Sequence, residues 1–163
     1  MPKGKTVIVV MGVSGSGKTE IGKLLSKELS RPFYDGDDFH LEANIKKMSS
    51  GNPLNDEDRK DWLIQLNKLA LKYRHSGAII ACSALKKNYR SILRAGMGNC
   101  MAFVYLNGSF ELIKSRLEER KGHFMPVDLL KSQFDTLEPP TKEITVSIEE
   151  TPEKIIKEIV KQL

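Results

Sequence analysis

The stretch Gly12-Val13-Ser14-Gly15-Ser16-Gly17-Lys18-Thr19 has the spacing of a phosphate-binding loop: a glycine, four residues and then Gly-Lys-Thr. It stands between an apolar β-branched run at residues 6–11 and a segment whose apolar residues recur at helical spacing. Glycines let backbone N–H groups approach phosphate oxygens, and the following helix N-terminus adds positive potential. We therefore expect all eight residues to hold nucleotide phosphates, with Lys18 at the β- and γ-phosphates and Thr19 on Mg²⁺. A flexible Gly/Ser linker would need neither the Lys-Thr pair nor a strand before it.

Apolar runs and amphipathic segments alternate along the rest of the chain. Asn55 is a suitable N-cap for a long helix, and Thr151 followed by Pro152 is suitable for the last one. The expected strands are residues 6–11, 33–34, 78–82, 101–106 and 144–148, and the expected helices fall at 21–29, 55–73, 87–94, 109–117 and 151–160. This alternation predicts an α/β fold, a parallel sheet flanked by helices, with the run at 6–11 as its central strand.

Length and composition fit one domain over residues 1–163. The chain is 40% hydrophobic and 29% charged, and its formal charge of +5 comes from basic residues that are mostly scattered. Such scattering favours anionic metabolites over nucleic acid as partners. The apolar run at residues 7–13 is much shorter than the roughly 20 residues that span a bilayer, so we expect no membrane anchor. Cys82 and Cys100 both lie in apolar stretches that resemble buried strands, which predicts reduced thiols and a cytoplasmic location.

An acidic segment, Asp35-Gly36-Asp37-Asp38, follows the second expected strand. In open α/β sheets, ligands bind beyond the carboxyl ends of the strands, and the phosphate loop shares that edge. We expect Asp35 to hold the magnesium ion through a water, and Asp37 to orient an acceptor hydroxyl and accept its proton. An acidic turn with a helix N-cap is the alternative, and it explains Asp38 well.

Arg116 and Arg120 lie four residues apart on one helical face and precede Lys121-Gly122-His123. This pattern predicts a lid at about residues 116–126 that places cations over the phosphates, with Arg120 stabilising transition-state charge. A solvated face paired with neighbouring glutamates is the alternative, and it applies most strongly to Arg116.

Features outside the phosphate loop distinguish between the classes of protein that contain such a loop. The chain has no Asn-Lys-x-Asp motif for guanine, and it is short for a motor ATPase. A small-molecule kinase remains, with an ATP-switched regulatory or nucleic-acid-binding module as the rival. Arg59, Lys86 and Arg90 suit an acceptor carboxylate, although each also suits a plain helix surface.

Four blocks of sequence make the chain resemble the gluconate kinases, relatives of the shikimate and nucleoside monophosphate kinases. They are MGVSGSGKT (11–19), DGDDFHLEANIKKMSSGNPLNDEDR (35–59), CSALKKNYR (82–90) and RKGHFMPVDLLKSQFDTLEPP (120–140). The resemblance implies a P-loop NTPase fold of the nucleoside monophosphate kinase type, with five parallel strands and a mobile lid. It also implies ATP and Mg²⁺, transfer of the γ-phosphate to D-gluconate to give 6-phosphogluconate, a homodimer, and a role at the entry to the pentose phosphate pathway.

The resemblance also implies roles for single residues. The acceptor region would span about residues 35–75, with Asp37, His40, Arg59, Lys86 and Arg90 near the sugar acid. Arg116, Arg120 and His123 would lie near ATP. Residues 136–140 resemble a loop that packs on adenine, although Glu138-Pro139-Pro140 also simply ends a helix. A different acceptor, such as shikimate or a nucleoside monophosphate, stays open as the alternative.

Overall fold

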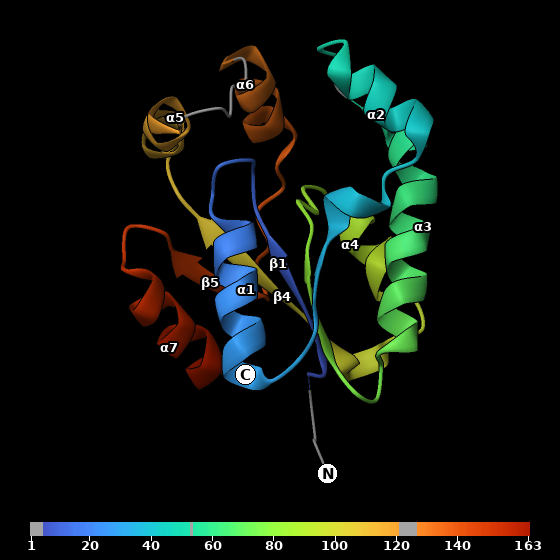
Figure 1. Cartoon of the computed structure of the whole chain (residues 1–163), viewed down its shortest axis with the longest axis vertical. Helices are drawn as coiled ribbons and strands as arrows, with labels where there is room; N and C mark the ends of the chain where they lie inside the picture. The colour runs from blue at the N-terminus through green and yellow to red at the C-terminus, as the bar shows by residue number, and fades with distance from the viewer. Residues whose placement is uncertain (1–4, 53, 121–126) are drawn as a thin grey trace.

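Five parallel strands form the centre of the structure, a computed structural model that describes residues 5–52, 54–120 and 127–163 (Figure 1). Their order across the sheet is β2-β3-β1-β4-β5, so β1 is central, as predicted. Val9 of β1 pairs with Ile80 on one side and with Phe103 on the other. The strands are β1 (Val7–Met11), β2 (Phe33–Asp35), β3 (Ala78–Ala81), β4 (Met101–Asn107) and β5 (Ile144–Ser147).

Helices cover both faces of this sheet. Figure 1 shows α1 (Lys18–Leu29) beside α7 (Pro152–Gln162) on one face, and α3 (Asp56–Lys72) beside α4 (Lys87–Arg94) on the other. Beyond the carboxyl ends of the strands stand α2 (Glu42–Ser49), α5 (Phe110–Glu119) and α6 (Val127–Thr136). Two 3₁₀ turns, η1 (Gly36–Phe39) and η2 (Gly98–Cys100), complete the described elements. The predicted class, a five-stranded parallel α/β sheet flanked by helices, is confirmed.

The predicted caps begin two of these helices. Asn55 accepts a hydrogen bond from the backbone N–H of Asp58, whose carboxylate accepts from the Asn55 N–H in return, so a capping box opens α3. The Thr151 hydroxyl accepts from the N–H of Lys154 at the start of α7. Capping satisfies N–H groups that the first turn leaves without intrahelical partners, which is why each helix starts where the sequence indicates.

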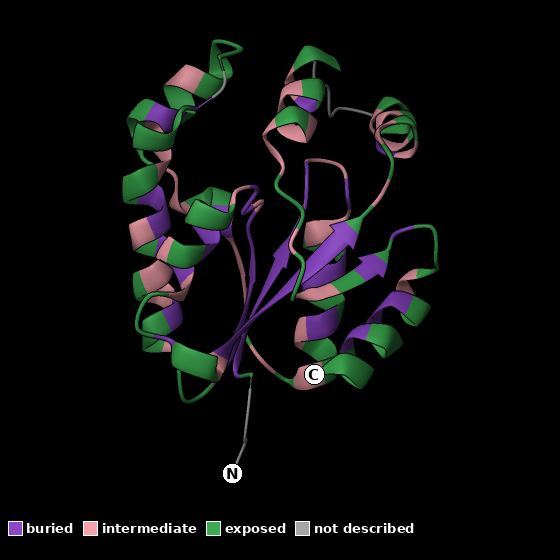
Figure 2. Ribbon diagram, turned by 180° about the vertical axis from the view of Figure 1, so that it is seen from behind, coloured by how far each residue is buried: buried purple, intermediate pink, exposed green. Residues whose placement is uncertain are grey.

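The core lies in the sheet and under the inner faces of the helices (Figure 2). Every residue of β1 is fully buried, as expected of a strand covered on both faces. Two residues of the predicted helical stripes depart from this pattern: Leu24 of α1 and Val160 of α7 are each 38% exposed. Both line the outer junction between the two helices, where no third element of the described chain covers them. Cys100 lies in η2, before β4, rather than inside a strand.

Replacing Leu66 with alanine is expected to lower the free energy of unfolding by about 2–5 kcal/mol, because its fully buried side chain would leave a cavity. Leu71, on the same helix, is 39% exposed, so Leu71→Ala should cost less than about 1 kcal/mol and serves as the matched control. Urea unfolding of both variants measures the difference. Equal losses would contradict the packing of α3.

None of the helices in the described ranges is long and apolar enough to cross a bilayer.

Candidate active site

The loop from Gly12 to Thr19, the P-loop below, joins β1 to α1 at the carboxyl edge of the sheet. Gly12 has φ 149°, and a Cβ there would stand 2.8 Å from the Ser16 hydroxyl, so a side chain would collide within the loop. Gly17 adopts a left-handed conformation (φ 97°) as the residue before α1, with open space around it. The Ser16 hydroxyl is buried and has no hydrogen-bond partner among the described residues. A glycine backbone facing open space and an unpaired hydroxyl fit a phosphate group.

Lys18 begins α1 and folds back over the loop, where its ammonium group donates a 3.0 Å hydrogen bond to the carbonyl of Val13. Burial lowers the pKa of Lys18, and the negative charges of Asp37 and Asp35 oppose that shift. The two carboxylates therefore lie close enough to Lys18 to act on its charge. The structure brings the acidic segment and the P-loop together at one edge of the sheet, as the sequence predicts.

Thr19 and Asp35 are two neighbouring side chains whose oxygen atoms suit a metal ion. The Thr19 hydroxyl donates to Asp35 Oδ2 at 3.4 Å, while Asp35 Oδ1 accepts from the backbone N–H of Asp37 at 3.0 Å. Across the described ranges no cluster of three or more His, Cys, Asp or Glu forms a metal cage. Mg²⁺ prefers oxygen ligands and is usually held by one or two protein groups together with phosphates and water. These two side chains fit that pattern.

Asp37 lies next to a stacked pair of aromatic side chains, His40 and Trp62. His40 Nε2 lies 3.7 Å from Asp37 Oδ1, and the imidazole stacks on Trp62 with ring centroids 4.0 Å apart. Trp62 is fixed by an indole N–H that donates to the carbonyl of Gly36 at 2.8 Å. The neighbouring imidazole of His40, and then the charge of Lys18, hold the pKa of the Asp37 carboxyl below its usual range. Asp37 is therefore an ionised carboxylate that lies beside a packed aromatic pair.

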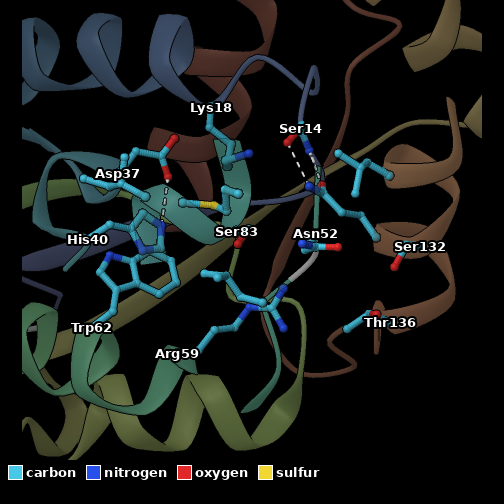
Figure 3. Close-up of a pocket in the computed structure, with 15 residues that line it drawn as sticks. Ser14, Lys18, Asp37, His40, Asn52, Arg59, Trp62, Ser83, Ser132 and Thr136 are labelled. Carbon is cyan, nitrogen blue, oxygen red and sulfur yellow. Dashed lines mark hydrogen bonds and ion pairs between the residues drawn. The ribbon is translucent and has the colours of Figure 1, made fainter. Parts of the chain in front are cut away.

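A cavity of about 410 Å³ opens beside this group (Figure 3). It combines one lysine, one arginine and one aspartate with many neutral polar side chains, and α2 and α6 contribute its apolar rim. The lining residues are Ser14, Lys18, Asp37, His40, Ile45, Met48, Asn52, Leu54, Arg59, Trp62, Ser83, Leu129, Ser132, Gln133 and Thr136. Such a lining suits a ligand with many hydroxyls and one negative charge.

Sequence reasoning missed the neutral half of this lining: Asn52, Ser83, Ser132, Gln133 and Thr136. All five fall within the blocks that carry the family resemblance. A single serine, threonine or amide has no spacing rule that separates a ligand contact from an ordinary surface residue, so the blocks were the only available signal.

Arg59 is the one of the three predicted acceptor cations that lines the cavity. Its guanidinium donates to the Tyr89 hydroxyl at 2.9 Å and lies over that ring at 5.3 Å. Tyr89 in turn donates to Asp56, which pairs with Lys86 at 3.0 Å. Lys86 therefore lies behind the cavity wall, where it pairs with Asp56, the carboxylate that accepts from Tyr89. The sequence predicted that Lys86 contacts the acceptor, but Lys86 is not among the residues that line the cavity.

Arg90 also makes hydrogen bonds within the chain. It is 7% exposed, and its guanidinium donates to the carbonyls of Ala84 at 2.7 Å and Glu138 at 2.8 Å. These bonds tie the segment after β3 to the segment after α6. Arg90 is not among the residues that line the first cavity, and both of its terminal guanidinium nitrogens already donate to backbone carbonyls. Its contact with the acceptor stays a prediction.

A second cavity, of about 390 Å³, lies on the opposite side of the P-loop, against Gly15–Gly17. Arg116 and Arg120 both line it, together with Ile148, which follows β5, and Pro152, which begins α7. Arg116 also donates to the carbonyl of Ile148 at 2.7 Å. Both arginines therefore lie beside the phosphate loop, and their contact with nucleotide phosphates stays a prediction. His123 and the rest of the expected lid beyond Arg120 lie outside the described residues.

Residues 136–140, which resemble a loop that packs on adenine, lie between the first cavity and the start of α4. Thr136 lines the first cavity, and the Glu138 carboxylate accepts from the backbone N–H of Lys87 at 2.7 Å. The segment therefore packs against the start of α4. The segment from Ile148 to Pro152 takes the place beside the second cavity, a position that sequence reasoning missed.

Comparison with known proteins gives concordant results. A family model described as "Shikimate kinase" matches residues 14–163. The chain is 45% identical to the thermoresistant gluconokinase of Escherichia coli (strain K12), over 92% of this chain and 89% of that protein. It is also 45% identical to a probable gluconokinase of Xenopus tropicalis, over 94% and 90% of the two chains. A crystal structure of a gluconokinase from Sinorhizobium meliloti 1021 superposes with a TM-score of 0.87 at 39% identity, covering 96% of this chain and 90% of that one.

Proposed function

The chain belongs to the gluconokinases, within the broader family that the shikimate kinase model describes, and we propose on this basis that it transfers the γ-phosphate of ATP to the 6-hydroxyl of D-gluconate. The products are ADP and 6-phospho-D-gluconate. It is an enzyme, an ATP-dependent kinase that acts on gluconate. The roles of its residues, the metal ion and the assembly are proposals that the following paragraphs support in turn.

The composition of the first cavity is the observation that supports gluconate as the acceptor. Gluconate has a carboxylate at one end, hydroxyls along its chain and the reacting hydroxyl at the other end. Lys18 and Asp37 border one part of the cavity, and Arg59 lies apart from them across it in Figure 3. Arg59 suits the carboxylate, the neutral polar side chains suit the hydroxyls, and the 6-hydroxyl then reaches Asp37 and the γ-phosphate held by Lys18.

In the proposed transfer, the 6-hydroxyl oxygen of gluconate attacks the γ-phosphorus while the bond to the bridging oxygen of ADP breaks. The reaction passes through a loose transition state in which charge spreads over the phosphoryl oxygens, and Lys18 stabilises that charge. Asp37 holds the hydroxyl by accepting its hydrogen bond, and it receives the proton as the new O–P bond forms. A carboxylate of lowered pKa suffices here, because the hydroxyl becomes strongly acidic only late, when bonding to phosphorus is advanced.

Thr19 and Asp35 would hold Mg²⁺, which would offset the negative charge of the triphosphate during transfer. The second cavity would take the nucleoside part of ATP, with Arg116 and Arg120 along the phosphates. Residues 116–126 would form a lid over them, within a single domain spanning residues 1–163.

Three further proposals rest on the family alone. The enzyme would act as a homodimer, in the cytoplasm, at the entry to the pentose phosphate pathway. Light scattering coupled to size-exclusion chromatography tests the dimer, since the mass of one chain is 18.4 kDa.

A panel of acceptors tests the proposed function. ADP release is measured with gluconate, shikimate and a nucleoside monophosphate as acceptors, with ATP and Mg²⁺ present in each assay. We expect turnover with gluconate and little with the others. Turnover with another acceptor and none with gluconate would end the proposal. Salt-dependent oligonucleotide binding without phosphorylation of any acceptor would favour the ATP-switched module instead.

Arg59→Lys is expected to raise the KM for gluconate by about tenfold or more, because lysine lacks the planar fork that binds a carboxylate through two hydrogen bonds. The KM for ATP should change little. Steady-state kinetics with D-glucitol, which lacks the carboxylate, provide an internal comparison, since the variant should lose selectivity for gluconate over this polyol. Exposed Lys60, the next residue on α3, gives the matched control Lys60→Ala. An unchanged KM for gluconate in Arg59→Lys would remove Arg59 from the acceptor site.

A further inference from the structure

Gln133 of α6 makes two hydrogen bonds to Ser14 in the P-loop. The Ser14 backbone N–H donates to Gln133 Oε1 at 2.7 Å, and Gln133 Nε2 donates to the Ser14 hydroxyl at 3.0 Å. The two residues are 119 positions apart in the chain, and both line the first cavity. This pair, the Ser14–Gln133 tie below, connects the wall of the acceptor cavity to the loop that binds phosphate.

The tie is separate from the contacts that hold α6 in place. Leu130 is 1% exposed, and the Phe134 ring meets Phe110 of α5 edge to face, with centroids 5.5 Å apart. These apolar contacts anchor one side of the helix. Gln133 is then free to exchange its polar partners without unseating α6, because its two bonds add to an already packed helix.

The Ser14 N–H already donates to an oxygen atom, the side-chain amide oxygen of Gln133, at a position where a nucleotide would offer a phosphate oxygen instead. P-loop N–H groups bind phosphate oxygens, and a charged phosphoryl oxygen is a stronger acceptor than a neutral amide oxygen. Ser14 also faces the cavity that contains Lys18 and Asp37, which is the side where the γ-phosphate meets the acceptor. A γ-phosphate therefore competes with Gln133 for Ser14, whereas ADP brings no phosphate to that position.

We propose that Gln133 is a positioning residue that couples the two substrate sites. Without a γ-phosphate its amide is held on Ser14; when ATP binds, the γ-phosphate takes the Ser14 N–H, and the released amide turns to the hydroxyls of the acceptor. The acceptor half of this inference rests on the proposed function, and the nucleotide half does not. Coupling between two ligands is reciprocal, so gluconate and a γ-phosphate-bearing nucleotide tighten each other's binding by the same factor.

Isothermal titration of the full chain tests the nucleotide half with AMP-PNP, a non-hydrolysable ATP analogue, and with ADP. Gln133→Ala removes the internal competitor, so the variant should bind AMP-PNP more tightly than the unmodified protein does by about threefold or more, with its ADP affinity unchanged. Gln133→Glu places a negative charge at the same point and should weaken AMP-PNP more than ADP. Lys131→Ala, exposed on the same helix, is the matched control. An AMP-PNP to ADP affinity ratio that is unaltered in Gln133→Ala overturns the proposal.

The acceptor half is tested by titrating gluconate alone, with ADP and with AMP-PNP. AMP-PNP should lower the Kd for gluconate by about fivefold or more and ADP should not, and Gln133→Ala should abolish the difference. Full coupling retained in Gln133→Ala overturns the acceptor half. If the unmodified protein neither binds nor phosphorylates gluconate, the proposed function fails. The titrations with AMP-PNP and ADP then still test whether the γ-phosphate displaces Gln133 from Ser14. Should Gln133→Ala unfold, Gln133→Met keeps the size of the side chain without its hydrogen bonds and takes its place.

Discussion

Lys18→Ala is expected to lower kcat by roughly 10³-fold or more, the scale on which single charge clamps act in phosphoryl transfer. The Lys18 ammonium lies between the P-loop and Asp37, where burial lowers its pKa but nearby carboxylates favour its charged form. A bound triphosphate brings further negative charge to the same point. Alanine removes the hydrogen bond to Val13 and the cation that, in the proposed transfer, meets charge developing on the transferred group.

ADP release at saturating ATP and gluconate measures this loss, and titration with ADP shows whether nucleotide binding survives. Lys27→Ala removes an exposed lysine from the last turn of the same helix and should leave kcat within about twofold. A Lys18→Ala variant that keeps more than about a tenth of the normal kcat would mean that the transferred phosphate sits elsewhere.

Asp37→Asn is expected to lower kcat by about 10²-fold or more while the Kd for ATP changes little, as befits a group that orients the acceptor and takes its proton. Asparagine has nearly the same shape, so the His40–Trp62 stack beneath it should persist. What is lost is the negative charge and the capacity to accept a proton. Single-turnover measurements separate this chemical step from product release.

Asp38→Asn, at the exposed neighbouring position, is the control for loss of one negative charge in the same turn. If Asp37→Asn and Asp38→Asn both turn over at near-normal rates, Asp37 is not the group that holds the hydroxyl.

The lowered pKa of Asp37 also sets the direction of its pH dependence. A carboxyl whose pKa is depressed in the folded protein stays ionised until the pH falls through that depressed value, below the ordinary value of about 3.9. Activity that depends on the Asp37 carboxylate, and the stability it contributes, are therefore present above that range and lost only at lower pH. His40→Phe removes the neighbouring imidazole and should move the acid limb of kcat upward.

The P-loop lines two cavities, which we assign to the two substrates. One side meets a polar cavity with Asp37 and Arg59, and the other meets a cavity with Arg116 and Arg120. Three strand ends of the same sheet supply the groups between them: the P-loop follows β1, Asp35 ends β2, and Ser83 follows β3. Because the strands are parallel, their carboxyl ends coincide, and residues distant in sequence meet without any special arrangement of loops.

The sequence by itself determined the features that are local or periodic. The spacing from Gly12 to Thr19 defines a phosphate loop because consecutive residues form it, and the apolar run at residues 7–11 reads as a central strand because both its faces are buried. Asn55 and Thr151 predict helix starts for the same reason, since a cap bonds within its own first turn.

Tertiary structure alone decided which of several similar residues face the site. Arg59 lines the first cavity while Arg90 binds two backbone carbonyls, although both are arginines on amphipathic helices. Leu24 belongs to an apolar stripe yet stays 38% exposed. The contact between Gln133 and Ser14 joins residues 119 positions apart. Such contacts depend on how helices pack against one sheet edge, and residue type and local spacing carry no information about which distant partner that packing supplies.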